Sequence, residues 1–388
     1  MGQAGDEGME AGRRAGRGGM TAIRRMGCIG ISAIVSLLIV HSVALAHGPG
    51  ARGSQTLYVV NEGSDTVSVI DIGSMKVTDT VTVGAGPQHI AISPDRRYAL
   101  VTCGRSAEVW ILALPAHTVV ATVPDATGPG SQTVFGAGGT YAYVTNSVYG
   151  RVTVIETATG KKVAIIPVGE APTQIGISPD GGHAYVPSER SHTVAALNLS
   201  LNVVAAELPM AVRPYAAEIS PDGKYLLVSS PESNSITIIN TATRQSLRRI
   251  PVGDDPHHVL FGPGGAFAYI MNRGSNSLSV IQMANHQVVA TIPVGKEPGD
   301  ADITPSGHYI YVTNTGSGDV SVISTLTSAV VATMPVGTRP HDIVVSGDGR
   351  YAFVVNTGSD DIAVINLLSQ TAVGRVPVGK RPHGLALW

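Results

Sequence analysis

The sequence predicts an all-β fold built from repeated four-stranded sheets, and three observations lead to this prediction. The motif Val-Gly-x-x-Pro recurs, with some degenerate copies, so that its prolines lie 42 or 43 residues apart. Apolar residues within each repeat alternate with a period of two, as in strands. Gly, Asn, Asp and Pro separate the short apolar runs, and the chain contains 46 Gly and 24 Pro. Such a fixed period indicates a repeat architecture. The prolines of the series are Pro87, Pro129, Pro172, Pro214, Pro256, Pro298, Pro340 and Pro382.

The copy that follows Pro340 shows the expected elements in order. Residues 341–349 are a short strand that runs into a turn, and residues 350–356 are a second strand. Residues 360–368 are a third strand and residues 371–379 a fourth. The turns between them make an antiparallel meander. One such sheet cannot bury both of its faces, so copies must stack around an axis, as the blades of a β-propeller do.

The number of strands predicts an eight-bladed β-propeller. The chain opens with strands two, three and four of one blade, and residues 383–388 supply the first strand of that blade. Pairing of these two segments closes the ring and removes exposed sheet edges. Seven blades are the alternative if the copy at Ser131 or at Tyr215 does not form. The second strands begin near Tyr58, Tyr98, Tyr141, His183, Tyr225, Phe267, Tyr309 and Tyr351.

The N-terminal segment resembles a secretory signal. Arg24 and Arg25 precede an apolar run that reaches Leu45, and small residues near its end favour cleavage after Ala46. An uncleaved membrane anchor is the alternative, because the apolar run is long for a signal. We therefore expect an exported protein, periplasmic or at the cell surface. The expected segments are an extension with a signal peptide (1–46), a short linker (47–56) and a single propeller domain (57–388).

Charge and cysteine content narrow the possible partners. The formal net charge is -2, and only 14% of the residues are charged, so no basic field favours nucleic acid or an anionic membrane. Contact with a membrane is expected only through the leader, if it stays uncleaved. Cys28 lies in the leader and Cys103 is the second of two cysteines, so the mature chain has no intrachain disulfide. We expect the mature protein to be a monomer.

Several repeats carry motifs that resemble the YVTN family of β-propeller repeats. Tyr-Val-Thr-Asn occurs at residues 143–146 and 311–314, and Ile-Ser-Pro-Asp-Gly at residues 177–181 and 219–223. The resemblance extends over residues 57–388. It implies an exported or cell-surface protein of bacterial or archaeal type. Neighbouring families include lactonase-like propellers and the d1-haem propellers of nitrite reductases.

The residues that follow each proline are the candidate site. Strands alternate in direction, so the loop before strand one and the loop between strands two and three share one face, and strand one is innermost. The third and fifth residues after proline are apolar, whereas the second and fourth are small or polar, and we expect these to face a water-filled channel. The candidate ligand-binding residues at the channel mouth are His89, Gln174, Glu218, His257, His258, Asp300, Asp302, His341, Asp342 and His383.

The histidines and acids of this set allow more than one interpretation. A histidine after proline can cap the loop, while His89, His341 and His383 can hold a transition metal or haem iron from three consecutive blades. Glu218 and Asp302 lie inside strand one, where burial favours shifted pKa values. Acidic residues of the loops suit calcium, but their spacing favours turn-stabilising roles. The residues in question are Asp65, Asp319, Asp360 and Asp361.

Catalytic motifs do not identify a reaction. The sequence has no Gly-x-Ser-x-Gly elbow, no His-Glu-x-x-His, no Cys-x-x-Cys-His and no phosphate-binding glycine loop. We therefore expect a binding or scaffold module that holds a protein, glycan or small ligand on its loop face. The alternative is a cofactor-binding or enzymatic propeller, d1-haem-like or lactonase-like, that uses the His and Asp ring. A structural surface-layer component is a third interpretation. No cofactor is required by the sequence.

Overall fold

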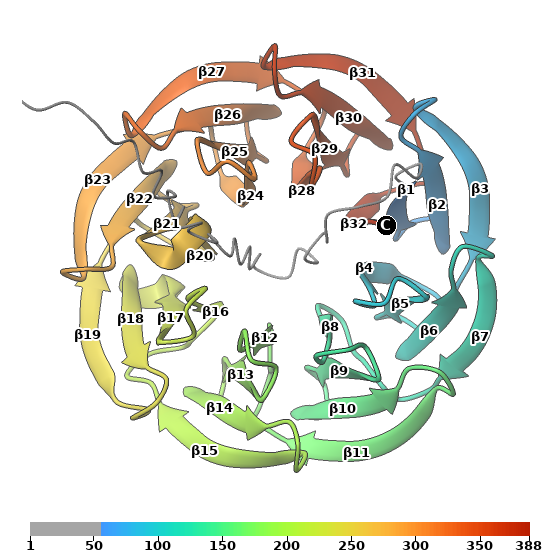
Figure 1. Ribbon diagram of the computed structural model, residues 1–388, viewed down its shortest axis with the longest axis horizontal. Helices are drawn as coiled ribbons and strands as arrows, with labels where there is room; N and C mark the ends of the chain where they lie inside the picture. The colour runs from blue at the N-terminus through green and yellow to red at the C-terminus, as the bar shows by residue number, and fades with distance from the viewer. Residues whose placement is uncertain (1–55) are drawn as a thin grey trace, which may run out of the picture. The chain divides into compact units, whose positions relative to one another are not determined.

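The computed structural model describes residues 56–388. This range contains 32 β-strands and two short 3-10 helices, η1 (Pro231–Ser233) and η2 (Pro263–Gly265). The strands form eight antiparallel sheets of four strands each, arranged as a ring (Figure 1). This confirms the eight-bladed propeller, because the copies at Ser131 and Tyr215 both form a blade.

Each blade is numbered in chain order, and its strands are given from the channel to the rim. Blade 1 contains β32 (Pro382–Leu387), β1 (Thr56–Asn61), β2 (Thr66–Asp71) and β3 (Lys76–Thr82). Blade 2 contains β4 (Pro87–Ile92), β5 (Tyr98–Cys103), β6 (Glu108–Ala113) and β7 (Thr118–Val123). Blade 3 contains β8 (Thr133–Phe135), β9 (Tyr141–Asn146), β10 (Arg151–Glu156) and β11 (Lys161–Pro167). Blade 4 contains β12 (Gly176–Ile177), β13 (His183–Ser188), β14 (Thr193–Asn198) and β15 (Val203–Pro209).

The remaining blades follow the same order. Blade 5 contains β16 (Ala217–Ile219), β17 (Tyr225–Ser230), β18 (Ser235–Asn240) and β19 (Ser246–Pro251). Blade 6 contains β20 (Pro256–Phe261), β21 (Phe267–Asn272), β22 (Ser277–Gln282) and β23 (Gln287–Pro293). Blade 7 contains β24 (Pro298–Ile303), β25 (Tyr309–Asn314), β26 (Asp319–Ser324) and β27 (Ala329–Pro335). Blade 8 contains β28 (Pro340–Val345), β29 (Tyr351–Asn356), β30 (Asp361–Asn366) and β31 (Thr371–Pro377).

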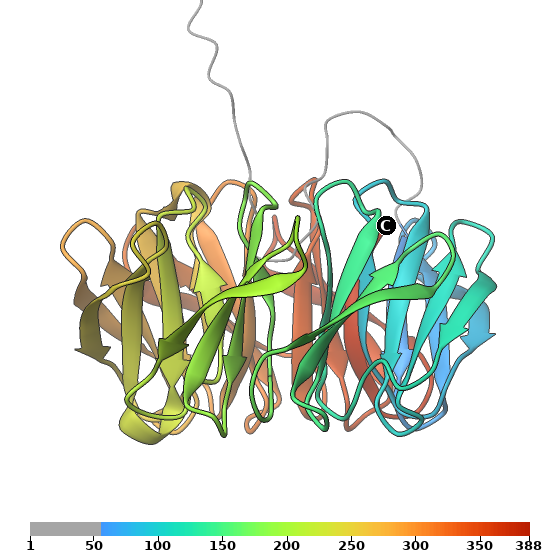
Figure 2. The same cartoon turned by 90° about the horizontal axis from the view of Figure 1, so that it is seen from below.

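The two sequence ends of the ring meet in blade 1, as predicted. β1 pairs antiparallel with β32, with Leu57 opposite Leu387 and Tyr58 opposite Ala386. The Trp388 N–H donates to the Thr56 carbonyl at 2.8 Å. The first strand of every blade lies at the centre of the ring and the fourth at its rim (Figure 1). Figure 2 shows the ring edge-on, with the loops gathered at its two faces.

Apolar side chains fill the space between neighbouring blades. Between blades 7 and 8, Tyr311 and Val322 pack in one buried cluster with Ile343, Val354 and Ile365. Successive residues of a strand point to opposite faces of the sheet. Apolar residues at alternate positions therefore lie at the interfaces between blades. The stacking that one blade needs to bury both faces is therefore provided by its neighbours.

The repeated Thr-Asn pair at the end of strand two is explained by hydrogen bonds. The Thr313 hydroxyl donates to the carbonyl of His341, in the inner strand of the next blade, at 3.1 Å. The Asn314 side-chain amide donates to the Ser321 hydroxyl of its own blade at 2.9 Å. One residue thus joins two blades, and the other fixes the loop between strands two and three.

The Ser-Pro-Asp-Gly turns lie at the opposite face. The Ser178 hydroxyl donates to the Asp180 carboxylate at 2.5 Å and accepts the His183 N–H at 3.0 Å. Gly181 has a φ of 69°, a left-handed conformation that glycine adopts without steric cost. These contacts reverse the chain between strands one and two, so the motif serves the fold.

The predicted leader lies outside the described residues. Within residues 56–388, no helix has the length and apolar character needed to cross a membrane.

Candidate functional site

The loops that flank the channel mouth lie on one face of the ring. The Gly358 N–H, between strands two and three of blade 8, donates to the carbonyl of Thr338, in the loop before strand one, at 2.9 Å. In blade 1, the corresponding Gly63 N–H donates to the Lys380 carbonyl at 2.8 Å. These hydrogen bonds place both kinds of loop together, as the strand directions predict.

Inner-strand residues alternate between the blade interfaces and the channel. The third residue after proline is buried in most blades, as in Ile90, Val259 and Ile343, whose exposed fractions are 3%, 1% and 4%. The second residue is half-buried in five blades, including His258 and Asp342, and is buried in the other three, as Ser131, Ala216 and Gly384. The expected pattern has exceptions at the fourth and fifth positions, where Asp302 is buried and Ile177 is half-buried.

Blades 6, 7 and 8 bring three of the candidate residues into one hydrogen-bonded cluster. His258 Nδ1 lies 2.5 Å from Asp300 Oδ1, and the two side chains are 28% and 22% exposed. The other Asp300 oxygen accepts the Ile343 N–H at 3.1 Å. The same N–H also donates to Asp342 Oδ1, at 2.9 Å. Asp342 in turn accepts the Leu385 N–H of blade 1 at 3.2 Å. The inner-edge N–H groups of one blade are thus capped by carboxyl groups of the blade before it.

Protonation in this cluster follows from burial and from the neighbouring charges. Burial opposes the charge of His258, but the Asp300 carboxylate outweighs it and raises the His258 pKa. Burial acts against the charge of Asp300 as well, but His258 holds its pKa below the ordinary value. Burial and the Asp300 carboxylate raise the pKa of Asp342 well above its ordinary value.

Two deeper carboxyl groups flank this cluster. Asp302 is 8% exposed and accepts the Ile303 N–H at 2.7 Å and the Val345 N–H at 2.8 Å. Burial raises its pKa to about 7. Burial also raises the pKa of Glu218, on blade 5, to about 8, and nearby His258 opposes this effect. No hydrogen bond to the Glu218 carboxyl is formed by the part of the chain that the structure describes.

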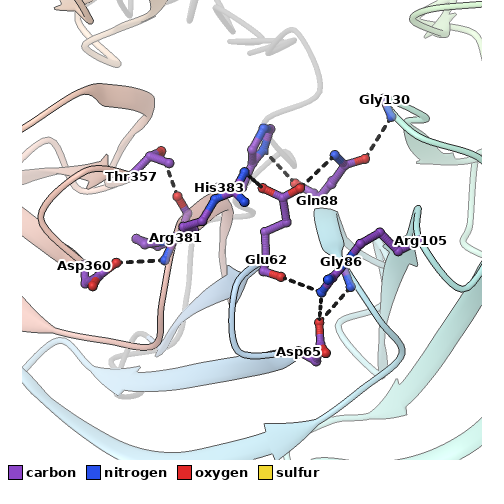
Figure 3. A network of polar contacts seen from close by, with 11 residues as sticks. Glu62, Asp65, Gly86, Gln88, Arg105, Gly130, Thr357, Asp360, Arg381 and His383 are labelled. Carbon is purple, nitrogen blue, oxygen red and sulfur yellow. Dashed lines mark hydrogen bonds and ion pairs between the residues drawn. The ribbon is translucent and has the colours of Figure 1, made fainter.

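A second group of histidines lies where the ring closes. The rings of His341 and His383 are 4.2 Å apart between centroids. His383 Nδ1 lies 3.1 Å from the Gln88 carbonyl (Figure 3). A carbonyl only accepts, so Nδ1 carries the proton and Nε2 of the neutral ring keeps its lone pair. Burial lowers the pKa of His341 and of His89 to about 4, and the neighbouring His383 adds to this effect in both. Burial lowers the pKa of His383 too, although Glu62 opposes the change.

Residues that sequence reasoning missed form a polar network beside His383 (Figure 3). Arg381 donates to Glu62 at 3.0 Å, and the Gln88 amide approaches the same carboxylate at 3.4 Å. Gln88 Oε1 accepts the Gly130 N–H of blade 3 at 2.8 Å. Gln88 occupies the repeat position that His257, His341 and His383 occupy in other blades, and this correspondence could have identified it.

Two candidate residues lie apart from these groups. The His257 ring lies 3.9 Å from the Tyr215 ring between centroids, and its Nδ1 is 3.7 Å from the Asp255 carboxylate. Burial lowers the His257 pKa, although Asp255 opposes this. Gln174, on blade 4, is half-buried, and the structure does not bring it to the carboxyl cluster or to the histidines at the closure.

The acidic loop residues have structural partners. Asp65 Oδ1 accepts the Gly86 N–H of the next blade at 2.8 Å, and Asp360 accepts that of Arg381 at 2.8 Å. Asp319 and Asp361 each accept an asparagine amide at 2.6 Å. These contacts agree with the turn-stabilising interpretation. Residues 56–388 contain no group of three or more His, Cys, Asp or Glu side chains that could hold a metal ion, and the site of His89, His341 and His383 stays a prediction.

Solved structures share this fold at low sequence identity. A dihydro-haem d1 dehydrogenase, NirN, in complex with DHE is 20% identical, with a TM-score of 0.74 over 85% of this chain and 74% of that one. Apo AztD from Citrobacter koseri is 14% identical, with a TM-score of 0.67 over 86% of this chain and 98% of that one. At these identities the likeness extends to the fold alone.

Curated relatives match shorter segments. The seven-bladed beta-propeller protein Rv1057 of Mycobacterium tuberculosis is 31% identical over 127 residues, which are 31% of this chain and 32% of that protein. The PE-PGRS family protein PE_PGRS18 of the same organism is 46% identical over 48 residues, 12% of this chain and 10% of that protein. The matched segments thus span about a third or less of these relatives.

A family model covers much more of the chain. The model described as "Lactonase, 7-bladed beta-propeller" matches residues 46–197 and 161–329. The blade count in that description differs from the eight blades found here. Because the two matches together cover more than half of the 388 residues, the chain belongs to the family described as Lactonase, 7-bladed beta-propeller.

Proposed function

We propose that this protein is an exported, YVTN-type binding propeller that holds a small polar ligand at the mouth of its central channel. The observation that carries the proposal is the half-ring of titratable side chains on the inner strands of blades 5 to 8. It consists of Glu218, His258, Asp300, Asp302 and Asp342. Buried ionisable groups are costly to maintain, and they gather where a protein binds or reacts.

The repeat indicates that a blade can form without a carboxyl group at the fourth position after proline. At the fourth position after proline, where blades 5 and 7 have Glu218 and Asp302, blade 2 has Ala91 and blade 8 has Val344. Those blades form four-stranded sheets as well. A carboxyl group at this position is therefore a local addition to the repeat, which supports a binding role.

The geometry also favours a small ligand. His258 and Asp300 remain 28% and 22% exposed while main-chain N–H groups and neighbouring side chains hold them in place. Such fixed groups lose little conformational entropy when a ligand binds. The Glu218 carboxyl, to which no described residue donates, is available as a partner for the ligand.

Export belongs to the same proposal and is supported by the leader. Mass spectrometry of the mature protein from a periplasmic fraction would then show an N-terminus at His47. Retention in the membrane with the leader intact would contradict cleavage.

Ligand-observed NMR tests the binding proposal directly. We would screen the protein against hydroxy acids, monosaccharides and small amines, and compare it with Glu218→Gln and His258→Ala. Hits should lose affinity by about tenfold or more when one charged hydrogen bond is removed. His308→Ala, an exposed histidine on the opposite face, should bind as the parent does. Hits that bind all four proteins equally would contradict a site in the channel.

A metal or cofactor site is the second candidate, because His341 and His383 lie together and no hydrogen bond within residues 56–388 engages Nε2 of His383. Neutral imidazoles are the form that binds zinc, copper or haem iron. The donor set therefore fits such a group if the group brings its remaining ligands. Calorimetry with Zn²⁺ should show binding that His383→Ala and His341→Ala abolish, and equal binding by these variants would exclude the histidine pair.

A further inference from the structure

Three hydrogen-bonded side chains join blades 1 and 2 away from the channel. The Tyr58 hydroxyl lies 3.1 Å from His117 Nε2, and His117 Nδ1 lies 2.9 Å from Asp79 Oδ2. A carboxylate only accepts, so Nδ1 of the neutral ring carries the proton and Nε2 accepts the Tyr58 hydroxyl. Tyr58 is 1% exposed, whereas the side chains of His117 and Asp79 are 19% and 49% exposed. The three groups thus lead from a buried phenol to solvent.

The carboxylate departs from the repeat. Asp79 on β3 pairs with Val69, the fourth residue of strand three in blade 1. In five other blades the residue at the position of Asp79 is an alanine. These alanines are Ala121, Ala164, Ala206, Ala290 and Ala332. A carboxylate that reaches the next blade is therefore a local addition to the repeat.

The histidine alone does not make the same arrangement elsewhere. His286 ends the turn between strands three and four of blade 6, as His117 does in blade 2. In blade 5, however, Arg248 has the place of Asp79 and Leu227 has that of Tyr58. Among the interfaces that the structure describes, the one between blades 1 and 2 combines phenol, imidazole and carboxylate at these three positions.

Other blades hold the same phenol without a base. Tyr143 has the place of Tyr58 in blade 3, and its hydroxyl donates to the Leu199 carbonyl at 3.3 Å. Tyr311 has this place in blade 7, and its hydroxyl has no hydrogen-bond partner within residues 56–388. Packing of the phenol is thus achieved with a carbonyl or without any partner. An imidazole oriented by a carboxylate supplies a proton acceptor beyond that need.

The burial of Tyr58 limits the chemistry that these groups can perform. A substrate cannot contact a hydroxyl group that is 1% exposed, so catalysis on a bound substrate is excluded. An electron can cross packed side chains, whereas a proton moves only along a hydrogen bond. Trp110 and Trp388, the two tryptophans of the chain, are half-buried and pack against the apolar cluster that contains Tyr58. Indole rings are readily oxidised, so they provide a path for an electron between Tyr58 and the surface.

We propose that Tyr58 is a redox-active tyrosine, which gives one electron to a strong one-electron oxidant while its phenolic proton passes to His117. Asp79 is a positioning residue, because it fixes the ring tautomer that accepts the proton. This inference goes beyond the proposed function and does not depend on a ligand at the channel mouth.

The step balances in electrons and protons. The Tyr58 O–H bond breaks, a bond forms between the proton and His117 Nε2, and the oxidant gains one electron. The products are a neutral tyrosyl radical, an imidazolium ion beside the Asp79 carboxylate and the reduced oxidant. Burial, together with the charge of Asp79, raises the pKa of Tyr58 to about 12, so the phenol keeps its proton at neutral pH until the electron leaves. Return of an electron and of the proton from Nε2 restores Tyr58 and His117.

Laser-flash oxidation of the purified full-length protein tests the proposal. Tris(bipyridine)ruthenium, excited in the presence of persulfate, supplies the oxidant, and electron paramagnetic resonance of frozen samples identifies the radical. We expect a tyrosyl signal in the parent protein and loss of most of this signal in Tyr58→Phe. Tyr311→Phe alters a similarly buried phenol that has no base, so it is the matched control and should keep the parent signal.

Transient absorption tests the proton step. Formation of the radical should slow by about 100-fold in His117→Gln, since a positioned base contributes about that factor or more. Asp79→Asn should slow it as well, because the asparagine amide donates to Nδ1 and leaves the ring proton on Nε2. The parent should react more slowly in D₂O than in H₂O, a readout that needs no variant and that a purely structural role of His117 would not produce.

Circular dichroism melting confirms that each variant is folded. Any of three results would overturn the inference: no tyrosyl radical in the folded parent, a signal of parent size in Tyr58→Phe, or equal rates of radical formation in the parent and His117→Gln. None of these results affects the proposed function, which the NMR screen tests with other variants.

Discussion

At the residue scale, Asp302 shows how burial on an inner strand changes the pKa of a carboxyl group. It is 8% exposed, both of its oxygens accept main-chain N–H groups, and burial still raises its pKa to about 7. Its two hydrogen bonds therefore do not offset the loss of hydration of the carboxylate. The folded state binds the Asp302 proton more tightly than an unfolded chain does, because the ordinary pKa is 3.8.

This difference predicts a pH-dependent stability. A raised folded-state pKa contributes stability that is complete below pH 3.8 and is lost as the pH rises to about 7. The free energy of unfolding should fall by about 1 kcal/mol per pH unit across this window from this residue alone. Asp302→Asn cannot ionise, so its unfolding free energy should show a shallower decline in urea titrations at pH 4 to 7. Identical slopes for the parent and the variant would contradict the raised pKa.

At the scale of elements, the inner strands differ in length more than the repeat in the sequence indicates. Alternation after each proline predicts a first strand in all eight repeats, and all eight form. However, β8, β12 and β16 have only three, two and three residues, whereas the other inner strands have six. The number of residues that pair with the second strand depends on the path of the backbone as well as on apolar alternation. The alternation in the sequence does not predict that path.

Hydrogen bonds between blades support these short strands. Thr145, which is fully buried, accepts the Gln132 N–H at 2.9 Å and lies 3.3 Å from the Thr173 carbonyl of the next blade. Thr145→Val should lower the free energy of unfolding by about 1–3 kcal/mol, because the Gln132 N–H and the Thr173 carbonyl lose a partner. Thr145→Ser keeps the hydroxyl and is the control. Denaturant unfolding should place the serine variant closer to the parent, and equal loss in both variants would assign the effect to packing.

At the scale of the whole molecule, the ring depends on the pairing of β1 with β32. Leu57, Tyr58 and Val59 face Leu387, Ala386 and Leu385, and the contact joins segments some 330 residues apart. Without β32, blade 1 would have three strands, and its inner edge would open to the channel.

Deletion of residues 382–388 should therefore prevent cooperative folding. Blade 1 would lose its inner strand and the apolar contacts of Leu385 and Leu387 with Val355 and Ile362 of blade 8. We expect a protein that aggregates or melts broadly, measured by calorimetry and size-exclusion chromatography. A truncated protein that melts at the parent temperature would refute closure through this strand.

The sequence predicted the ring well and the site only in part. Period, turns and alternation are local properties, so the eight blades followed from them. The hydrogen bonds that tie Gln88 to Glu62 and Asp342 to Leu385 cross from one blade to the next. Their existence depends on how closely neighbouring blades approach, which a single repeat does not reveal.

The pairing of β1 with β32 also sets an order of events during synthesis. Strands β1, β2 and β3 emerge first, yet the inner edge of β1 has no partner until residues 382–387 follow. Contacts over such a sequence separation form slowly, since a long loop must be closed before they are gained. For most of its synthesis the chain therefore carries an open strand edge that can pair with another molecule. A chaperone that shields this edge during that interval would therefore prevent such pairing.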